Sequence, residues 1–238
     1  GAADTLDPDD YGYGAGSPAI GAATGGGNSG FAIGDVIKTN LVGGLGWLTG
    51  YRHESAAATN LITYSQDFTN AAWIKSNVGT LAIDATGPDG ETSAVTFVDS
   101  GATGVAVTAA IYLATVSTST TYTYSIFAKA DQLSWLTLRT FLFTTGDGFS
   151  TFDLSNGVVG TSAAAHTTNI EDFGGGWYRC SITFTTDVAD TSGQIINYIA
   201  DSDSGVGTPT VDLDGTSSIL IYGAQLEEGS IPTSYIPT

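Results

Sequence analysis

Two tryptophan–arginine pairs are the residues of this chain best suited to binding a ligand. Trp135 lies four positions before Arg139, and Trp177 lies two positions before Arg179. An even spacing places both members of a pair on the same face of a β-strand. Aromatic rings pack on the apolar face of a sugar, and a guanidinium donates paired hydrogen bonds to hydroxyls or carboxylates. These four residues are therefore the predicted glycan-binding site.

The same residues also allow a purely structural interpretation. Tryptophan rings in β-sandwiches commonly cover the sheet that carries them. The arginines would then pair with nearby carboxylates, for which Glu171, Asp172 and Asp153 are the candidates. The sequence leaves both interpretations open.

Acidic residues near the middle of the chain suggest a structural calcium ion. Asp84, Asp89 and Glu91 would supply carboxylate oxygens, which are the ligands that Ca²⁺ prefers. The alternative is that these residues form turns by hydrogen bonding to their own backbone. Calcium is the only cofactor that the sequence suggests, because Cys180, His53 and His166 are too few and too scattered for a usual zinc site.

Two later segments, Asp201–Gly205 and Asp212–Gly215, superficially resemble calcium loops. An EF-hand needs glycine at its sixth position and glutamate at its twelfth, counted here from Asp201. The chain has Val206 and Asp212 at those positions. An EF-hand is therefore excluded.

No arrangement typical of an active site is visible. The five glutamates fall mostly at expected turns or near the C-terminal end, so no acid–base pair for glycoside hydrolysis stands out. No Gly-x-Ser-x-Gly elbow accompanies the two histidines. The prediction is a binding or structural protein rather than an enzyme.

Composition narrows the possible partners. The chain carries 24 acidic and 6 basic residues, a formal net charge of −18. Such a charge repels nucleic-acid phosphates and anionic membrane surfaces. No apolar run reaches the ~18 residues of a membrane-spanning helix. The expected partners are therefore neither nucleic acids nor membranes.

Period-two alternation predicts an all-β protein with an antiparallel sheet. The clearest strands are 120–130, 134–143 and 177–185, with Leu136, Leu138 and Leu142 on the core face of the second. Turn residues separate further expected strands at roughly the 8–12-residue spacing of a sandwich, namely 61–64, 78–84, 93–98, 105–114, 149–153, 166–171, 193–200 and 218–226. Residues 70–75 are expected to form one helical turn.

The chain divides into two parts that differ in composition and hydrophobic pattern. Residues 1–58 are glycine-rich, with short apolar pieces between Phe31 and Trp47 that are unusual for a free linker. They are expected to form an extended arm that attaches the protein to a larger assembly, with a disordered linker as the alternative. Residues 59–238 are expected to form the β-sandwich.

Several segments together resemble a known family. They are NLITYSQDFTNAAW (60–73), GPDGETSA (87–94), YTYSIFAKA (122–130), SWLTLR (134–139), FDLSNGVVGT (152–161), IEDFGGGWYRCSITF (170–184) and IYGAQLEEGSIPTSYIPT (221–238). They are similar to the jelly-roll domain of bacteriophage tail-fibre, minor-tail and head-spike proteins and of gene-transfer-agent particles, which resembles carbohydrate-binding modules. The resemblance covers residues 60–238.

This resemblance implies an antiparallel jelly-roll β-sandwich in a virion protein, often a homotrimer. It implies adhesion to a host surface polysaccharide, with other virion proteins bound through the N-terminal arm. The alternatives are a structural decoration or adaptor protein without a ligand, and a non-catalytic module of a polysaccharide depolymerase.

Overall fold

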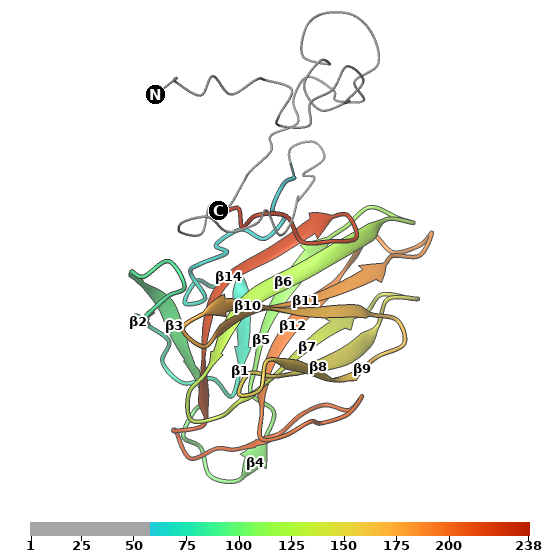
Figure 1. Ribbon diagram of the computed structural model, residues 1–238. Helices are drawn as coiled ribbons and strands as arrows, with labels where there is room; N and C mark the ends of the chain where they lie inside the picture. Colours follow the sequence, from blue (N-terminus) through green and yellow to red (C-terminus); the bar gives the residue numbers. More distant parts are fainter. Residues whose placement is uncertain (1–57) are drawn as a thin grey trace, which may run out of the picture. The chain divides into compact units, whose positions relative to one another are not determined.

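The computed structural model describes residues 58–238, whose strands pair in antiparallel β-sheets (Figure 1). The predicted N-terminal arm, apart from Ala58, lies outside the described residues. Within 58–238 there is no α-helix, and consequently no helix that could cross a membrane.

Two six-stranded sheets make up the fold. The first has the order β1 (Trp73–Ser76), β5 (Ala109–Thr115), β12 (Ser192–Ala200), β7 (Trp135–Phe141), β8 (Gly148–Asp153) and β9 (Val158–Ser162). The second has the order β10 (Thr167–Gly174), β11 (Trp177–Thr185), β6 (Thr121–Ala130), β14 (Ser218–Glu228), β3 (Thr92–Val98) and β2 (Ile83–Thr86). A two-stranded sheet, β13 (Val211–Asp212) with β4 (Val105–Ala106), completes the set. The predicted all-β, antiparallel jelly-roll-like sandwich is confirmed for this part of the chain.

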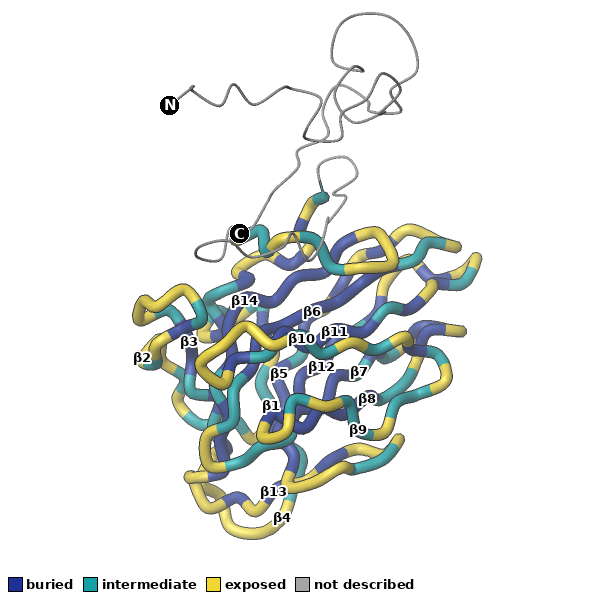
Figure 2. The backbone as a smooth tube through the Cα atoms, in the orientation of Figure 1, coloured by how far each residue is buried: buried dark blue, intermediate teal, exposed yellow. Residues whose placement is uncertain are grey.

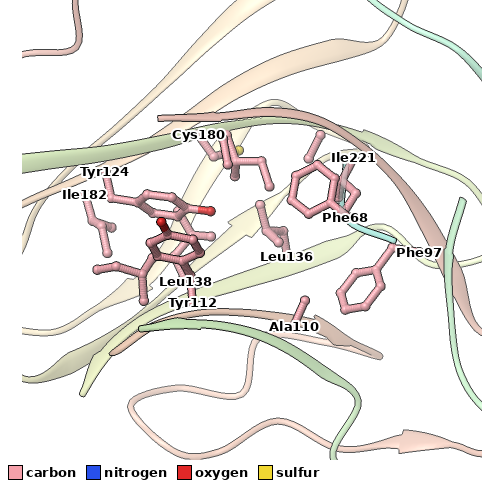
Figure 3. Close-up of a cluster of buried hydrophobic side chains, with 14 of the residues drawn as sticks. Phe68, Phe97, Ala110, Tyr112, Tyr124, Leu136, Leu138, Cys180, Ile182 and Ile221 are labelled. Carbon is pink, nitrogen blue, oxygen red and sulfur yellow. The ribbon is translucent and has the colours of Figure 1, made fainter. Parts of the chain in front are cut away.

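The core lies between the two sheets because alternate residues of each strand point inward. Tyr124, Cys180 and Ile182 of the second sheet face Leu136 and Leu138 of the first, and all five are buried (Figure 3). Buried positions follow the strands, whereas exposed positions concentrate in the connecting loops (Figure 2). Burial also raises the pKa of the Cys180 thiol, so this cysteine is an unreactive core residue, as its place in the pattern predicts.

Several expected elements differ from the observed ones. Residues 70–75 do not form a helical turn; two successive turns there lead into β1 instead. Residues 61–64 are not a strand, and the Thr63 amide is held by the Tyr112 hydroxyl at 3.0 Å. The expected strand 105–114 is divided into β4 and β5, and β9 was not predicted.

Leu142 was expected on the core face but is exposed. Its backbone has a φ of 67°, in the left-handed region, so the alternation of β7 breaks at this residue. Phe143 is buried against Phe184 instead, with ring centroids 5.0 Å apart. The local pattern fails here because the strand ends at Phe141, two residues earlier than expected.

The outer face of the second sheet is covered by the end of the chain, residues 230–238, here called the C-terminal strap. The Tyr235 ring lies against Phe127 and Tyr222, and its hydroxyl is 2.7 Å from the Ser65 hydroxyl. The Asn60 side-chain amide donates to the carbonyl of Ile236 at 2.9 Å. The strap therefore joins the first described residues to the last ones, which lie side by side in Figure 1.

A buried carboxylate anchors the strap. Glu227 is fully buried and accepts hydrogen bonds from the Thr233 amide at 2.9 Å and the Thr233 hydroxyl at 2.7 Å. Gly223 lies at a bulge in β14 with a φ of 60°, and a Cβ there would lie 3.1 Å from the Tyr235 ring. The segment from Ile221 to Thr238 carries much of the family resemblance, and several of its residues serve to hold the strap on the second sheet.

Candidate functional site

The four predicted glycan-binding residues do not form one site. Trp135 and Arg139 belong to β7 and lie on the outer face of the first sheet. Trp177 and Arg179 belong to β11 and lie on the outer face of the second sheet. The two pairs are therefore on different faces of the sandwich.

Trp177 and Arg179 are covered by the chain itself. Only 4% of Trp177 and 3% of Arg179 are exposed. The Arg179 guanidinium donates to the Ser125 hydroxyl at 2.9 Å and to the carbonyl of Thr233 in the strap at 2.6 Å. Arg179 therefore holds the strap in place, and Trp177 packs in a buried cluster with Phe127 and Tyr222, which matches the structural interpretation rather than glycan binding.

On the first sheet, Arg139 is the centre of a cluster formed by Arg139, Phe141, Asp147, Phe149 and Tyr198, here called the Arg139 cluster. The guanidinium carbon lies 4.0 Å from the Phe141 ring centroid and 4.3 Å from that of Phe149. The Phe149 ring is in turn 6.1 Å from the Tyr198 ring. Contacts with two rings fix the position of a side chain that is otherwise flexible.

The strand order produces this cluster. Arg139 is the cross-strand partner of Phe149 in β8 and of Ile196 in β12, while Phe141 comes two residues later on the same face. Asp147 lies just before β8, and its Oδ1 is 3.6 Å from Arg139 Nε. The cluster therefore combines residues from three adjacent strands and one loop.

The cluster's polar groups have unused hydrogen-bonding capacity. Arg139 Nε is buried and has no hydrogen-bond partner among the described residues. The Arg139 side chain is 18% exposed and that of Asp147 is 39% exposed. The pair is therefore only partly exposed, and a ligand would reach it from the Asp147 side and through the exposed part of the guanidinium, where hydroxyl groups can replace water.

Trp135 lies farther along β7, beyond the buried Thr137. A Cβ added at Gly160 would lie 2.8 Å from Trp135 Cζ3 and 2.9 Å from Asp203 Oδ2, so the indole packs over this glycine. Four residues of strand separate Trp135 from Arg139, or ~13 Å. Both residues are partly exposed, so this face offers an aromatic platform and a cation at separate points.

The other half of this face is aliphatic. A cross-strand row continues from Arg139 through Ile196 and Ile111 to Ile74, and Leu113 lies on the adjacent row. Ile74 is 47% exposed and Leu113 is 58% exposed. Polar recognition on the first sheet is therefore concentrated at its β7–β8 side.

Buried hydrogen bonds hold the loop that carries Asp147. His166 Nε2 lies 2.7 Å from the Thr140 hydroxyl, which also donates to the carbonyl of Gly146, and His166 Nδ1 lies 2.8 Å from the Ser150 hydroxyl. Burial lowers the pKa of His166, although a hydrogen bond with the Gly146 backbone and the charge of Asp147 both act to raise it. This histidine is a structural support for the cluster, and its burial keeps it away from a ligand.

The predicted calcium ligands are engaged in local hydrogen bonds. Asp84 accepts from the Thr96 amide and hydroxyl, at 3.2 and 2.9 Å. Asp89 accepts from the Ser93 hydroxyl at 2.6 Å and from the Glu91 amide at 3.1 Å. Between residues 58 and 238 no three histidine, cysteine or acidic residues gather in a way that could hold a metal. These residues therefore do not fit a calcium site: Asp89 forms a turn, as the alternative predicts, and Asp84 in β2 is bound to Thr96 in the neighbouring strand β3.

In the two loops that superficially resemble calcium sites, aspartate oxygens likewise accept hydrogen bonds from the chain itself, across the fold for Asp203 and within a turn for Asp214. Asp203 accepts from the Thr151 hydroxyl at 2.8 Å and from the Thr161 amide at 2.8 Å. Burial works to raise the pKa of Asp203, but the hydrogen bonds from Gly205, Thr151 and Thr161 lower it overall. Asp214 accepts from the Thr216 amide and hydroxyl, both at 2.8 Å.

Sequence reasoning missed part of the cluster. Alternation places Phe141 on the same face as Arg139, so this neighbour could be predicted from the sequence. To predict that Phe149 and Tyr198 lie near Arg139, the strand order must be known, and to predict the same of Asp147, the loop conformation must be known. No local signal in the sequence brings these three residues to Arg139.

Comparisons with known proteins gave matches among solved structures alone. No protein-family model and no curated protein sequence matches the chain. One similar solved structure, described as "CBM4 structure and function", has a TM-score of 0.37 and 14% identity, over 70% of this chain and 84% of that one. Another is the enzymatically active domain of tailspike protein 4 of bacteriophage CBA120, with a TM-score of 0.39 and 13% identity, over 71% of this chain. The similarity spans 21% of that tailspike chain.

Proposed function

We propose that this chain is a virion adhesion protein that binds a host surface glycan on the outer face of its first β-sheet. The binding residues are those of the Arg139 cluster, with Trp135 farther along β7. The proposal combines the sequence resemblance to phage jelly-roll domains with the position of Arg139. It assigns the protein no catalytic step.

The single observation that carries the proposal is the fixed but incompletely bonded guanidinium of Arg139. Two phenylalanine rings hold it at 4.0 and 4.3 Å, its buried Nε has no hydrogen-bond partner in the described part of the chain, and 18% of the side chain is exposed to a ligand. Sugar recognition needs this combination of rigid donors beside apolar rings. On the second sheet, Arg179 has its donors occupied by the chain itself.

Adhesion through one such site would be weak, and repeated copies would compensate. A shallow polar site with few contacts gives a dissociation constant of about 1 mM, or ~4 kcal/mol of binding free energy. Several linked sites raise the overall affinity by about 10²–10⁴ without new contacts. The proposed assembly is a homotrimer attached to other virion proteins through residues 1–58.

The test is a glycan microarray probed with the full chain and three variants. Arg139→Ala should abolish the signal, whereas Lys129→Ala, which removes a positive charge from the second sheet, should preserve it. Trp135→Ala should weaken binding because it removes the aromatic platform. Loss of signal in Lys129→Ala to the same extent as in Arg139→Ala would contradict the proposed location.

A structural role without a ligand is the second candidate. It is favoured by the tight packing of Tyr198 and Ile196, which are only 4% and 3% exposed. On this alternative, Arg139→Ala and Trp135→Ala would lower the free energy of unfolding, and the assembled wild-type protein would bind no glycan.

A further inference from the structure

We infer that the glycan bound at the Arg139 cluster is neutral, and that two of its hydroxyl groups bridge Arg139 and Asp147. This inference rests on the proposed function and specifies the chemical class of the ligand. It follows from the pairing of the two charges, from their hydrogen-bonding capacity and from the charge of the chain.

Arg139 and Asp147 offer complementary groups at one place on the surface. Their closest approach is 3.6 Å, between Nε and Oδ1, which is an ion pair but too long for a good hydrogen bond. A guanidinium can only donate hydrogen bonds, and an ionised carboxylate can only accept them. A sugar hydroxyl does both, so one hydroxyl can accept from Arg139 while its neighbour donates to Asp147.

An acidic sugar fits this pair poorly. Its carboxylate could accept from Arg139, but it would face the like charge of Asp147, 39% exposed beside the same guanidinium. The chain as a whole carries a formal charge of −18, which further disfavours a polyanion at low ionic strength. A ligand without charge avoids both penalties.

Gln194 extends the neutral polar surface. Its cross-strand partners are Leu113 in β5 and Phe141 in β7, so it lies on the outer face next to the Arg139 cluster. An amide offers both a donor and an acceptor and carries no charge. A surface made of Gln194, Arg139 and Asp147 suits the hydroxyl groups of a ligand better than it suits a carboxylate, which would be a second anion beside Asp147.

The experiment compares neutral and uronate-bearing polysaccharides with the full chain. Laminarin, galactomannan and xyloglucan serve as neutral probes; alginate, polygalacturonate and hyaluronan serve as acidic ones. Asp147→Asn is the test variant, and Glu91→Gln, which removes one negative charge from the turn between β2 and β3 beside the other sheet, is the matched control. Thermal unfolding of each variant checks that it is folded.

The expected result is binding to at least one neutral polysaccharide and to none of the acidic ones. Asp147→Asn should weaken that binding about tenfold, because a hydrogen bond to a charged acceptor is lost, and Glu91→Gln should leave it unchanged. Binding to an acidic probe, or binding to a neutral probe that Asp147→Asn leaves unchanged or strengthens, would overturn the inference while the proposed function stands. Absence of binding to all six polysaccharides would overturn the proposed function itself.

Discussion

The guanidinium of Arg179 donates a 2.6 Å hydrogen bond to the carbonyl of Thr233, which fastens the C-terminal strap across the second sheet. The same guanidinium contacts the Ser125 hydroxyl, so it connects β11, β6 and the end of the chain. This relationship gives the two tryptophan–arginine pairs different roles. One pair stabilises the fold, and the other is proposed to bind a ligand.

Arg179→Ala should destabilise the protein without affecting glycan binding. The variant leaves the Thr233 carbonyl and the Ser125 hydroxyl without their charged donor, which should cost about 2–3 kcal/mol in the free energy of unfolding. Urea denaturation measures this loss. Lys129→Ala is the control and should change the free energy by less than about 1 kcal/mol. Equal stabilities for the two variants would refute the role assigned to Arg179.

Tyr235→Ala should release the strap. The ring packs on Phe127 and Tyr222, and burial raises the pKa of its hydroxyl to about 12. Removing the ring should cost about 3 kcal/mol. Tyr235→Phe removes only the contact with Ser65 and should cost about 1 kcal/mol. If both variants unfold at the same urea concentration as the wild type, the strap does not support the fold.

Gly193→Ala should disturb the core because the site has no room for a methyl group. A Cβ there would lie 2.3 Å from the Phe143 ring, which is itself packed against Phe184. Overpacking of this kind costs about 1–3 kcal/mol. Gly207→Ala is the control, since its nearest atom would be the Ser204 carbonyl oxygen at 3.5 Å. A stability for Gly193→Ala equal to that of Gly207→Ala would show that the ring moves freely.

His166 should make stability depend on pH in the mildly acidic range. Burial lowers the pKa of His166 in the folded state, below the ~6.5 of an unfolded histidine. As pH falls through about 6.5, the unfolded chain takes up a proton before the folded one does, so the free energy of unfolding decreases. Above that pH this contribution to the pH dependence disappears.

The measurement for His166 is urea denaturation at pH 7.5 and pH 5.5. His166→Gln should reduce the difference between the two values, and His53→Gln should leave it unaltered. Aspartates shift in both directions: hydrogen bonds from Ser155 and Asn156 lower the pKa of Asp153 although burial opposes the effect, whereas burial and the charge of Asp212 raise the pKa of Asp201. The His166→Gln variant separates the histidine from both. A difference that persists in His166→Gln would assign the pH dependence to other groups.

Much of the fold could be predicted from the sequence because local alternation determines which side chains face the core. In β6, Tyr122, Tyr124 and Ile126 occupy the core face as the period-two pattern requires. The prediction failed where a single backbone conformation interrupts the period. Leu142 with its positive φ is the clearest case.

The site was harder to predict because its accessibility depends on distant residues. Trp135 and Trp177 occupy the same kind of position in their strands, so local sequence cannot separate them. Only the strap, which returns to β11 some 50 residues later with Thr233, buries Arg179. The partners of Arg139 depend in the same way on strand order, which places Phe149 opposite it.

The most direct test of the central claim is a residue-level map of the glycan footprint. Amide chemical shifts of the full chain should be followed during titration with the oligosaccharide that gives the strongest microarray signal. We expect shifts confined to β7, β8, β12 and the loop carrying Asp147, with no shifts around Trp177 and Arg179 in β11. Shifts centred on β11 and the strap, with β7 undisturbed, would contradict it.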